Sequence, residues 1–392
     1  MNLAQLYSLT TGKKLGKIKL LEKFYPLPFE RIVTFQPFSK DSKNYDYWQE
    51  VLNIIYPILE KENIKIIQIG AVNEKGFLNC YHTQGTTSLN QCFYIISKSL
   101  LNLSTDSFSS HIAGIYDKPL VCLFSNNHSK NVGPFYGEKS KQILLEPNRE
   151  KFPRPSYSFQ EFPKSINSIF PEIITQSILK LLNLPYSYPF KSLFFGGMYN
   201  QMILEGIPNQ TVDLKPLGTD SNFVMRMDIL FNEEFLFNQL KLSKCLIYTD
   251  RPINKDLIRA AKPQIQEVIY ELNEHNSWPD YIEFLQELGV KFTLLSYCSD
   301  EIINKLKLDY FDYGIIHKRD QNPPKEIENI DKNNLYYKTN RYILSNQKIY
   351  TSLATLKENR TVSNFGNNIE KIPDSSEFWK EKDFVYLLEK TS

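Results

Sequence analysis

The sequence predicts an α/β protein with two domains, each a largely parallel sheet flanked by helices. Two observations favour this fold class. The chain has 392 residues, enough for two or three domains with sizeable cores. From Arg31 to about residue 320, short apolar runs alternate with longer segments of helical periodicity. Such alternation is typical of parallel strands joined by right-handed crossovers.

The first half contains the clearer alternation. Proline opens the last of its helices and Pro185 follows the end of that helix. The apolar runs predict strands at 32–35, 64–69, 100–104, 120–124 and 143–145, and the periodic segments predict helices at 47–60, 88–99 and 171–184.

The second half repeats the pattern less regularly and ends in a β-prone region. We expect strands at 192–195, 223–229, 246–248, 292–297 and 314–317, with helices at 233–240, 281–288 and 301–306. The domain boundary is placed at the Pro- and Tyr-rich segment 186–189. The chain is thus divided into a strap at 1–29, a first domain at 30–185, a second at 190–320 and a C-terminal extension at 321–392.

Composition excludes several classes of protein. The 46 basic and 44 acidic side chains give a formal net charge of +2, so nucleic acid is not a favoured partner. The five cysteines are widely spaced and form no C-x-x-C pair, which favours free thiols. We find neither a signal peptide nor a run of roughly twenty apolar residues, and therefore expect a cytoplasmic protein without a membrane span.

The stretch that organises the chain is S-T-D-S-F-S-S-H, residues 104–111. A strand ends at Asp106, and a helix rich in small hydroxyl residues follows it. The N–H groups of a first helical turn lack partners within the helix, and the helix dipole favours an anion there. A phosphate or diphosphate is the expected ligand. The alternative is that Asp106 and Ser107 simply cap the helix.

Other polar side chains follow the remaining predicted strands. Because ligands bind beyond the carboxyl ends of parallel strands, these residues should share one rim. No G-x-G-x-x-G follows a strand, so a dinucleotide cofactor is not supported. The rim residues are Ser39, Lys43, Glu74, Asp106 and Ser107.

Several short segments in this region resemble one known family in the same order. They are K-x-aromatic at 43–45, a glycine followed by Glu74, G-T-T-S-L at 85–89, D-S-x-x-x-H-x-A-G at 106–114 and G-P-F-Y-G at 133–137. Together, over about residues 30–185, they resemble the nucleotide-sugar half of the ADP-heptose:lipopolysaccharide heptosyltransferase family. That resemblance implies a GT-B-like fold, in which two Rossmann-like domains face each other across a cleft.

The resemblance also implies roles for the rim residues. Ser107 and the N–H groups after it would hold the diphosphate of a nucleotide sugar, and His111 would donate to it. Lys43 would supply positive charge, with Ser39 beside it. Glu74 would bind ribose hydroxyls, and Thr86 and Thr87 would line the sugar or phosphate. The alternative is ordinary surface charge for Lys43 and Glu74, and a backbone-bonded polar side chain for His111.

The general base does not follow the family's pattern. In the family it is an acidic residue of the domain that precedes the nucleotide half, but only about 30 residues precede that half here. Either the domain order is permuted, with residues 190–320 as acceptor domain, or catalysis has been lost. Asp250, at the end of a predicted strand, is the preferred base, with Asp228 and Asp300 as rivals. Capping or turn formation explains each equally well.

The predicted function is transfer of a sugar from a nucleotide-diphosphate donor to a hydroxyl acceptor. The acceptor could be a glycan, a lipid-linked saccharide or a modified nucleobase. The alternative is a non-catalytic binding or structural protein on a retired GT-B fold. We expect no metal site, because no His, Cys and Asp cluster shows ligand spacing, and no cofactor besides the nucleotide sugar as co-substrate.

Overall fold

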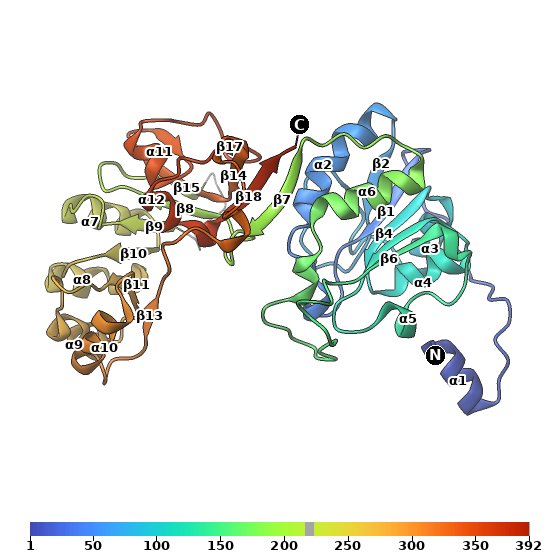
Figure 1. The fold of residues 1–392 in the computed structure, drawn as a ribbon, viewed down its shortest axis with the longest axis horizontal. Coiled ribbons are helices and arrows are strands. Elements are labelled where there is room, and N and C mark those ends of the chain that lie inside the picture. The colour runs from blue at the N-terminus through green and yellow to red at the C-terminus, as the bar shows by residue number, and fades with distance from the viewer. Residues whose placement is uncertain (216–222, 392) are drawn as a thin grey trace. The chain divides into compact units, whose positions relative to one another are not determined.

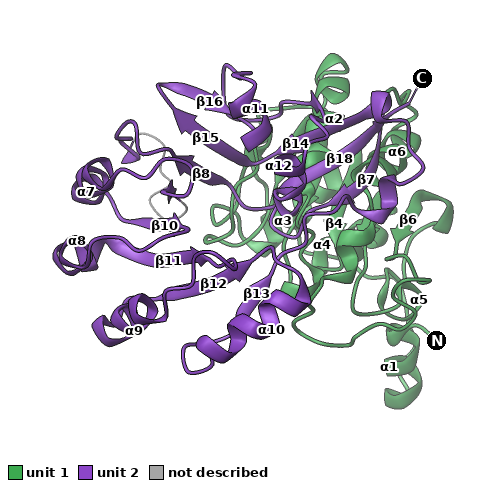
Figure 2. Cartoon of the chain, turned by 60° about the vertical axis from the view of Figure 1, so that its left-hand side comes forward, with its two compact units in different colours: residues 1–189 green, residues 190–392 purple. Residues whose placement is uncertain are grey.

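The computed structural model describes residues 1–215 and 223–391. The chain divides into two compact units, residues 1–189 (unit 1) and residues 190–392 (unit 2). Figures 1 and 2 show the helices and strands of each unit. Among the described residues, no helix is both long and apolar enough to cross a bilayer.

Unit 1 contains a six-stranded parallel sheet with the order β3-β2-β1-β4-β5-β6. The short apolar runs of the sequence form the central strands of this sheet. The strands are β1 (Ile32–Gln36), β2 (Lys65–Gln68), β3 (Tyr81–His82), β4 (Leu101–Thr105), β5 (Leu120–Leu123) and β6 (Gln142–Leu145).

Helices cover both faces of this sheet, as expected for a doubly wound domain. On one face α2 (Trp48–Lys61) packs against α6 (Pro171–Leu182), and Trp48 contacts Phe35 of β1. On the other face α3 (Leu89–Lys98) and α4 (Phe108–Ile115) bury their apolar sides. Two further helices, α1 (Leu3–Thr11) and α5 (Ser129–Val132), lie outside these layers.

Unit 2 contains an eight-stranded sheet with the order β13-β12-β11-β10-β9-β8-β15-β16, parallel except for the last pair. Its strands are β8 (Ile203–Gly206), β9 (Phe223–Arg226), β10 (Cys245–Thr249), β11 (Ile265–Glu271), β12 (Phe292–Ser296), β13 (Ile316–Lys318), β15 (Arg341–Ser345) and β16 (Lys348–Tyr350).

The helices that connect these strands all pack on one face. Strands β9 to β13 follow one another in chain order across the sheet, so right-handed crossovers place every connecting helix on the same side. Figure 2 shows them side by side. They are α7 (Glu233–Leu242), α8 (Lys255–Ala261), α9 (Pro279–Leu288) and α10 (Asp300–Asp309). Alternate strand residues therefore point to a second face, which these helices do not cover.

The C-terminal residues belong to unit 2 and do not form a separate extension. The sequence analysis ended the second domain at residue 320 and placed a separate extension at 321–392. In the structure, β15 of that extension pairs with β8 inside the eight-stranded sheet, so both segments belong to unit 2. The same region builds most of an antiparallel sheet of β7 (Phe190–Phe195), β14 (Leu335–Thr339), β17 (Glu370–Lys371) and β18 (Val385–Lys390). Two short helices, α11 (Leu353–Lys357) and α12 (Ser376–Trp379), complete it.

The α/β fold class with parallel sheets is confirmed in both units. The strap at 1–29 is part of unit 1: Leu20, Tyr25 and Leu27 pack against the core beneath α3 and α4. Two expectations stay predictions: that the strand ends of the two units face a common cleft, and that the order of the two domains is permuted.

Candidate functional site

The strand order of unit 1 creates a crevice between β1 and β4. The chain runs from β1 outward to β3 and then returns to β4 on the other side of β1. The loops after β1 and β4 therefore leave the sheet in opposite directions, and a ligand can enter between them at this topological switch point. Ser39 and Lys43 follow β1, and Asp106 and Ser107 follow β4.

An ion pair joins the two sides of this crevice. Lys43 Nζ lies 2.5 Å from Asp106 Oδ2, and both side chains are largely buried. Ser39 Oγ donates to the backbone oxygen of Asp106 over 3.2 Å. Lys43 is positioned to supply the positive charge that the sequence analysis assigned to it. Its ammonium group, however, is already paired with the carboxylate of Asp106.

The amino end of α4 lies beside this pair. Ser107 is the residue before the helix, with extended backbone, and its side chain makes no capping hydrogen bond. The N–H of Ser109 donates to Gln36 Oε1 over 3.2 Å. Within the described part of the chain, the buried hydroxyl of Ser109 finds no partner. Since Asp106 binds Lys43 and Ser107 makes no cap, simple capping does not account for either side chain.

His111, one turn along α4, faces the same concavity. Loss of solvent around its ring lowers the pKa of His111; the charge of Asp106 opposes that shift and Lys43 adds to it. The imidazole is therefore mainly neutral near pH 7, when no anion is bound nearby.

The N-terminal helix forms one wall of this concavity. The space encloses about 400 Å³. The side chain of Asn2 donates to the carbonyl oxygen of Gly133 over 3.0 Å, which holds the start of α1 there. The lining residues are Asn2, Leu3, Ala4, Tyr7, Lys43, Asp106, His111, Val132, Gly133 and Phe135.

Five of the sequence-predicted binding residues do not line this concavity. Ser39 and Ser107 lie beside it, next to Asp106, whereas Glu74, Thr86 and Thr87 lie elsewhere. Glu74 lies against Gly70, where its carboxylate would collide with any added Cβ, and burial raises the pKa of Glu74. Thr86 and Thr87 both donate their hydroxyls to the carbonyl oxygen of Thr83. These three residues follow β2 and β3, whereas Lys43, Asp106 and His111 meet at the switch point.

Sequence reasoning missed two contributors to this site. Gln36, the last residue of β1, holds the first turn of α4 through Ser109. The available signal was its polar side chain at the end of a mostly apolar strand. Asn2 and the helix that it starts have no such signal, because α1 meets the site only through the tertiary fold.

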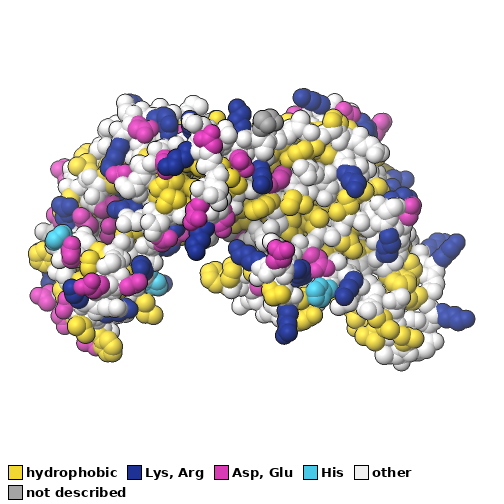
Figure 3. Space-filling model, in the orientation of Figure 1, with side chains coloured by type: hydrophobic (Ala, Val, Ile, Leu, Met, Phe, Trp, Pro, Cys, Tyr) yellow, Lys and Arg dark blue, Asp and Glu magenta, His cyan; other side chains and the backbone are white. Residues whose placement is uncertain are grey.

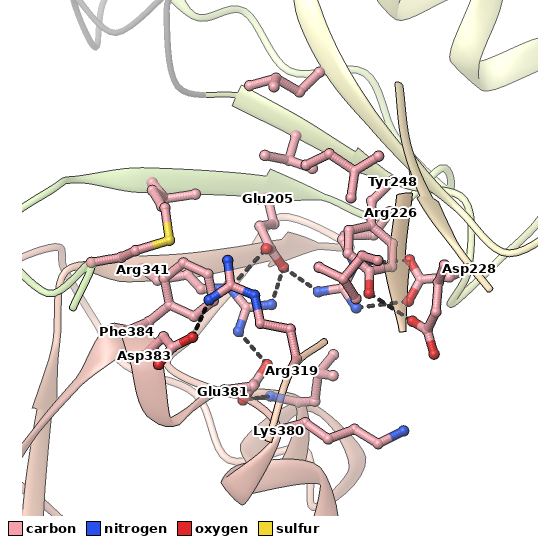
Figure 4. A pocket seen from close by; sticks show the side chains of 18 of the residues that line it. Glu205, Arg226, Asp228, Tyr248, Arg319, Arg341, Lys380, Glu381, Asp383 and Phe384 are labelled. Atoms are coloured by element: carbon pink, nitrogen blue, oxygen red, sulfur yellow. Dashed lines mark hydrogen bonds and ion pairs between the residues drawn. The ribbon is translucent and has the colours of Figure 1, made fainter. Parts of the chain in front are cut away.

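Unit 2 contains a larger pocket on the second face of its eight-stranded sheet (Figure 4). The pocket encloses about 580 Å³, a size typical of small-molecule sites. Alternate residues of neighbouring strands line it, among them Arg226, Tyr248, Ile269 and Glu271. The segment 380–384 also contributes to its wall.

Buried charges join three strands and the C-terminal segment at this pocket. Glu205 of β8 accepts hydrogen bonds from Arg226 of β9 (2.6 Å) and from Arg341 of β15 (2.7 Å), and Arg341 also binds Glu381. Burial disfavours the charged carboxylate of Glu205, but the two guanidiniums overcome that effect and lower its pKa. Figure 4 shows these side chains pointing toward one another. All the ions of this network are therefore paired.

The proposed general base, Asp250, lines the pocket directly after β10. Arg251 donates to both of its oxygens, over 2.8 and 3.2 Å, and the Asp250 side chain keeps 29% of its surface exposed at the pocket's edge. The rival Asp228 also lines the pocket, but Arg226 holds both of its oxygens at 2.7–2.8 Å. Asp300 does not line the pocket; it lies at the start of α10 and pairs with Lys318.

Several carboxylates that the sequence analysis did not consider also line the pocket, and Glu271 is one of them. Glu271, the last residue of β11, accepts a hydrogen bond of 2.6 Å from the hydroxyl of Tyr248.

Across the described ranges 1–215 and 223–391, no group of three or more His, Cys, Asp or Glu side chains could hold a metal ion.

Part of unit 1 is similar to a known protein family. Residues 32–158 match the model of glycosyltransferase family 9 (heptosyltransferase). This match confirms, over those residues, the resemblance found in the motifs. No curated protein sequence matches the chain.

Solved structures of the same family are similar to part of the chain. Escherichia coli ADP-heptose lps heptosyltransferase II is 17% identical and covers 40% of this chain and 48% of its own, with a TM-score of 0.31. The Veillonella parvula family 9 glycosyl transferase is 14% identical and covers 46% and 50%, with a TM-score of 0.32. E. coli heptosyltransferase WaaC with ADP is 16% identical, covering 39% and 44%, with a TM-score of 0.30. The chain thus spans about half the length of these proteins.

Proposed function

We propose that this chain, whose residues 32–158 are a heptosyltransferase-like region of glycosyltransferase family 9, transfers a sugar from a nucleotide diphosphate to a hydroxyl acceptor. Unit 1 binds the donor. The observation that carries the proposal is the grouping of Lys43, Asp106 and His111 at the β1–β4 switch point, inside the family-matched region. The nucleotide sugar serves as co-substrate, and no further cofactor is needed.

In this function, unit 1 stabilises the leaving diphosphate. Negative charge develops on the diphosphate as the bond to the sugar breaks, and fixed dipoles and cations at that place lower the barrier. The first turn of α4 supplies N–H groups, Lys43 supplies a cation, and His111 donates a hydrogen bond. Asp106 holds Lys43 in position until the diphosphate arrives, and Ser39 fixes the backbone of Asp106.

The acceptor binds in the pocket of unit 2. Hydroxyl groups suit its mixture of carboxylates, cations and tyrosine rings, because a sugar hydroxyl both donates to carboxylates and accepts from cations. Asp250 acts as general base: it takes the proton of the attacking hydroxyl at the accessible edge of the pocket. The acceptor is accordingly a glycan or another polyhydroxylated molecule.

Donor binding is tested by calorimetry with a panel of nucleoside diphosphates and nucleotide sugars. Lys43→Ala should weaken diphosphate binding by roughly 1–3 kcal/mol, the range for a charge-assisted hydrogen bond. The matched control is Lys141→Ala, which removes another ion-paired lysine of unit 1, bound to Asp117 on the exposed surface. If the native chain binds no nucleotide of the panel, or if Lys43→Ala binds as well as the control, the donor site is wrong.

The general base is tested by transfer and donor-hydrolysis assays. Asp250→Asn should abolish turnover and leave nucleotide binding unchanged, because the donor contacts lie in unit 1. Asp300→Asn is the control, since that carboxylate pairs with Lys318 and does not line the pocket. Turnover retained by Asp250→Asn would move the role to Glu271. Donor binding without turnover by the native chain under any condition would favour a non-catalytic protein.

A further inference from the structure

The first 24 residues expose an unusual number of large apolar side chains. Figure 3 shows apolar side chains gathered on the surface of α1, with lysines along the outer edge. Several of them leave more than 60% of their surface to solvent, notably Tyr7, Leu9, Leu21 and Phe24. Together with these, the exposed apolar residues of the segment are Met1, Leu3, Leu6, Leu15 and Ile18. No residue of α1 is buried.

The same segment concentrates positive charge. Five lysines and one glutamate, Glu22, lie within residues 13–23, although the whole chain carries a formal net charge of only +2. The rest of the chain is therefore net acidic. All five lysines are exposed, and none forms an ion pair with a described residue. They are Lys13, Lys14, Lys17, Lys19 and Lys23.

Backbone groups and inward-facing side chains hold most of the segment on unit 1. Backbone oxygens do so: Leu21 accepts from the side chain of Asn90 over 2.7 Å, and Gly16 accepts from the hydroxyl of Tyr136 over 2.9 Å. Inward-facing Leu20, Tyr25 and Leu27 pack on the core. Phe24 also packs edge-on against Tyr94, and Leu3 and Tyr7 line the concavity of unit 1, but all three remain partly exposed. The lysines and the exposed parts of the apolar side chains can therefore contact another surface.

We propose that residues 1–24 bind the surface of an anionic lipid bilayer. Lysines interleaved with exposed aliphatic and aromatic side chains match both parts of such a surface: the lysines pair with anionic headgroups, and the apolar side chains enter the interface between headgroups and acyl chains. Binding of nucleic acid would use the lysines alone, and would leave Leu6, Leu9, Leu21 and Phe24 exposed to water. The segment contains no arginine for stacking or bidentate contacts.

The proposal links the donor site to a membrane. Asn2, Leu3 and Tyr7 line the concavity that contains Lys43 and His111, so a bilayer that binds α1 lies next to the donor site. An acceptor carried by a lipid would then be presented near it. The bilayer contact itself does not depend on the glycosyltransferase assignment, since it uses none of Lys43, Asp106 and His111.

The test is co-sedimentation of the full chain with vesicles. Vesicles of phosphatidylcholine mixed with phosphatidylglycerol should bind the chain at low salt, and pure phosphatidylcholine vesicles should bind it much more weakly. Leu6→Ser with Leu9→Ser should reduce binding to anionic vesicles by at least about tenfold, as should Lys13→Glu with Lys17→Glu. These four side chains are exposed, so the variants should fold, which thermal melting checks.

Two matched controls make the result specific. Leu308→Ser with Phe311→Ser removes two apolar side chains of unit 2 that are more exposed than Leu6 and Leu9. Lys305→Glu with Lys371→Glu reverses the charge of two exposed lysines there. Both controls should bind vesicles as the native chain does. Absence of binding, equal binding to neutral vesicles, or equal losses in the controls would overturn the proposal. Equally tight binding to duplex DNA, unaffected by the leucine pair, would assign the lysines to a polyanion and also overturn it.

Discussion

Lys43 and Asp106 show how one residue's surroundings change its role. In isolation, Lys43 is a cation available to phosphate; in the fold, it is held by a carboxylate 2.5 Å away. A diphosphate must compete with Asp106 for the ammonium group, so the strength of donor binding depends on both residues. His111 is the third member of this group and can respond to pH near neutrality.

The pH dependence of donor binding should come from His111. Loss of solvent lowers its pKa in the free protein, and the negative charge of a bound diphosphate raises it again. Binding therefore takes up protons, and affinity should increase as pH falls from about 8 to about 6. The increase should be at most roughly tenfold for each step of one in pH, because a single group takes up at most one proton. His111→Asn should remove this dependence.

Calorimetry of a nucleotide sugar in buffers of different ionisation enthalpy measures that proton uptake. A nucleotide sugar is preferable to a free diphosphate, whose terminal phosphate titrates in the same range. Gln91→Asn, in α3, is a conservative control away from the concavity. An equal proton uptake by the native chain and His111→Asn would show that His111 does not face the diphosphate.

At the scale of elements, α1 has the least support. It has nine residues, too few for a stable isolated helix, and none is buried. Asn2 gives it a capping box with Gln5 and also anchors its start through Gly133. The wall that α1 forms at the donor site thus depends largely on a single side chain.

Removing this side chain should loosen the wall without unfolding unit 1. Asn2→Ala eliminates a cap worth about 1 kcal/mol and the bond to Gly133, so the amides of α1 should exchange with solvent faster. Hydrogen exchange followed by mass spectrometry measures this for residues 1–11. Thr10→Ala, near the other end of α1, is the control. An unchanged exchange rate in Asn2→Ala would mean that other contacts hold the helix.

At the scale of the whole molecule, the buried charges of unit 2 explain why its C-terminal part cannot be separated from it. Glu205 and Arg226 come from strands early in the unit, whereas Arg341 and Glu381 come from its last 60 or so residues. β15 lies inside the sheet, between β8 and β16. A chain ending at residue 320 would lose this strand and leave Glu205 with only one of its two cations.

Breaking this network should destabilise unit 2 strongly. Arg341→Met leaves Glu381 and part of Glu205 buried without a cation, which costs on the order of 3–5 kcal/mol. Urea unfolding of the full chain should show an earlier transition for unit 2. Arg259→Met, whose partner Asp256 is exposed, should change the transition little. Equal effects in the two variants would contradict the role assigned to the network.

Much of unit 1 was predictable because its signals are local. The predicted strands at 32–35, 100–104 and 120–124 are within one residue of β1, β4 and β5 at either end, since buried parallel strands appear as short apolar runs. Pro171 marked the start of α6. In unit 2, β11 was missed because its two faces differ: Val268 and Tyr270 pack under helices, whereas Glu267 and Glu271 line the pocket.

The sequence alone determined the alternation of strands and helices, the similarity of residues 32–158 to glycosyltransferase family 9 and the rim on which Ser39, Lys43, Asp106 and Ser107 lie. These follow from periodicity and from short motifs, which involve neighbours along the chain. Only the tertiary structure decided that Asp106 pairs with Lys43, that α1 lines the site and that β15 completes the sheet of unit 2. Each of these depends on contacts between residues far apart in the sequence, and such pairings are set by packing of the whole unit, which no local pattern records.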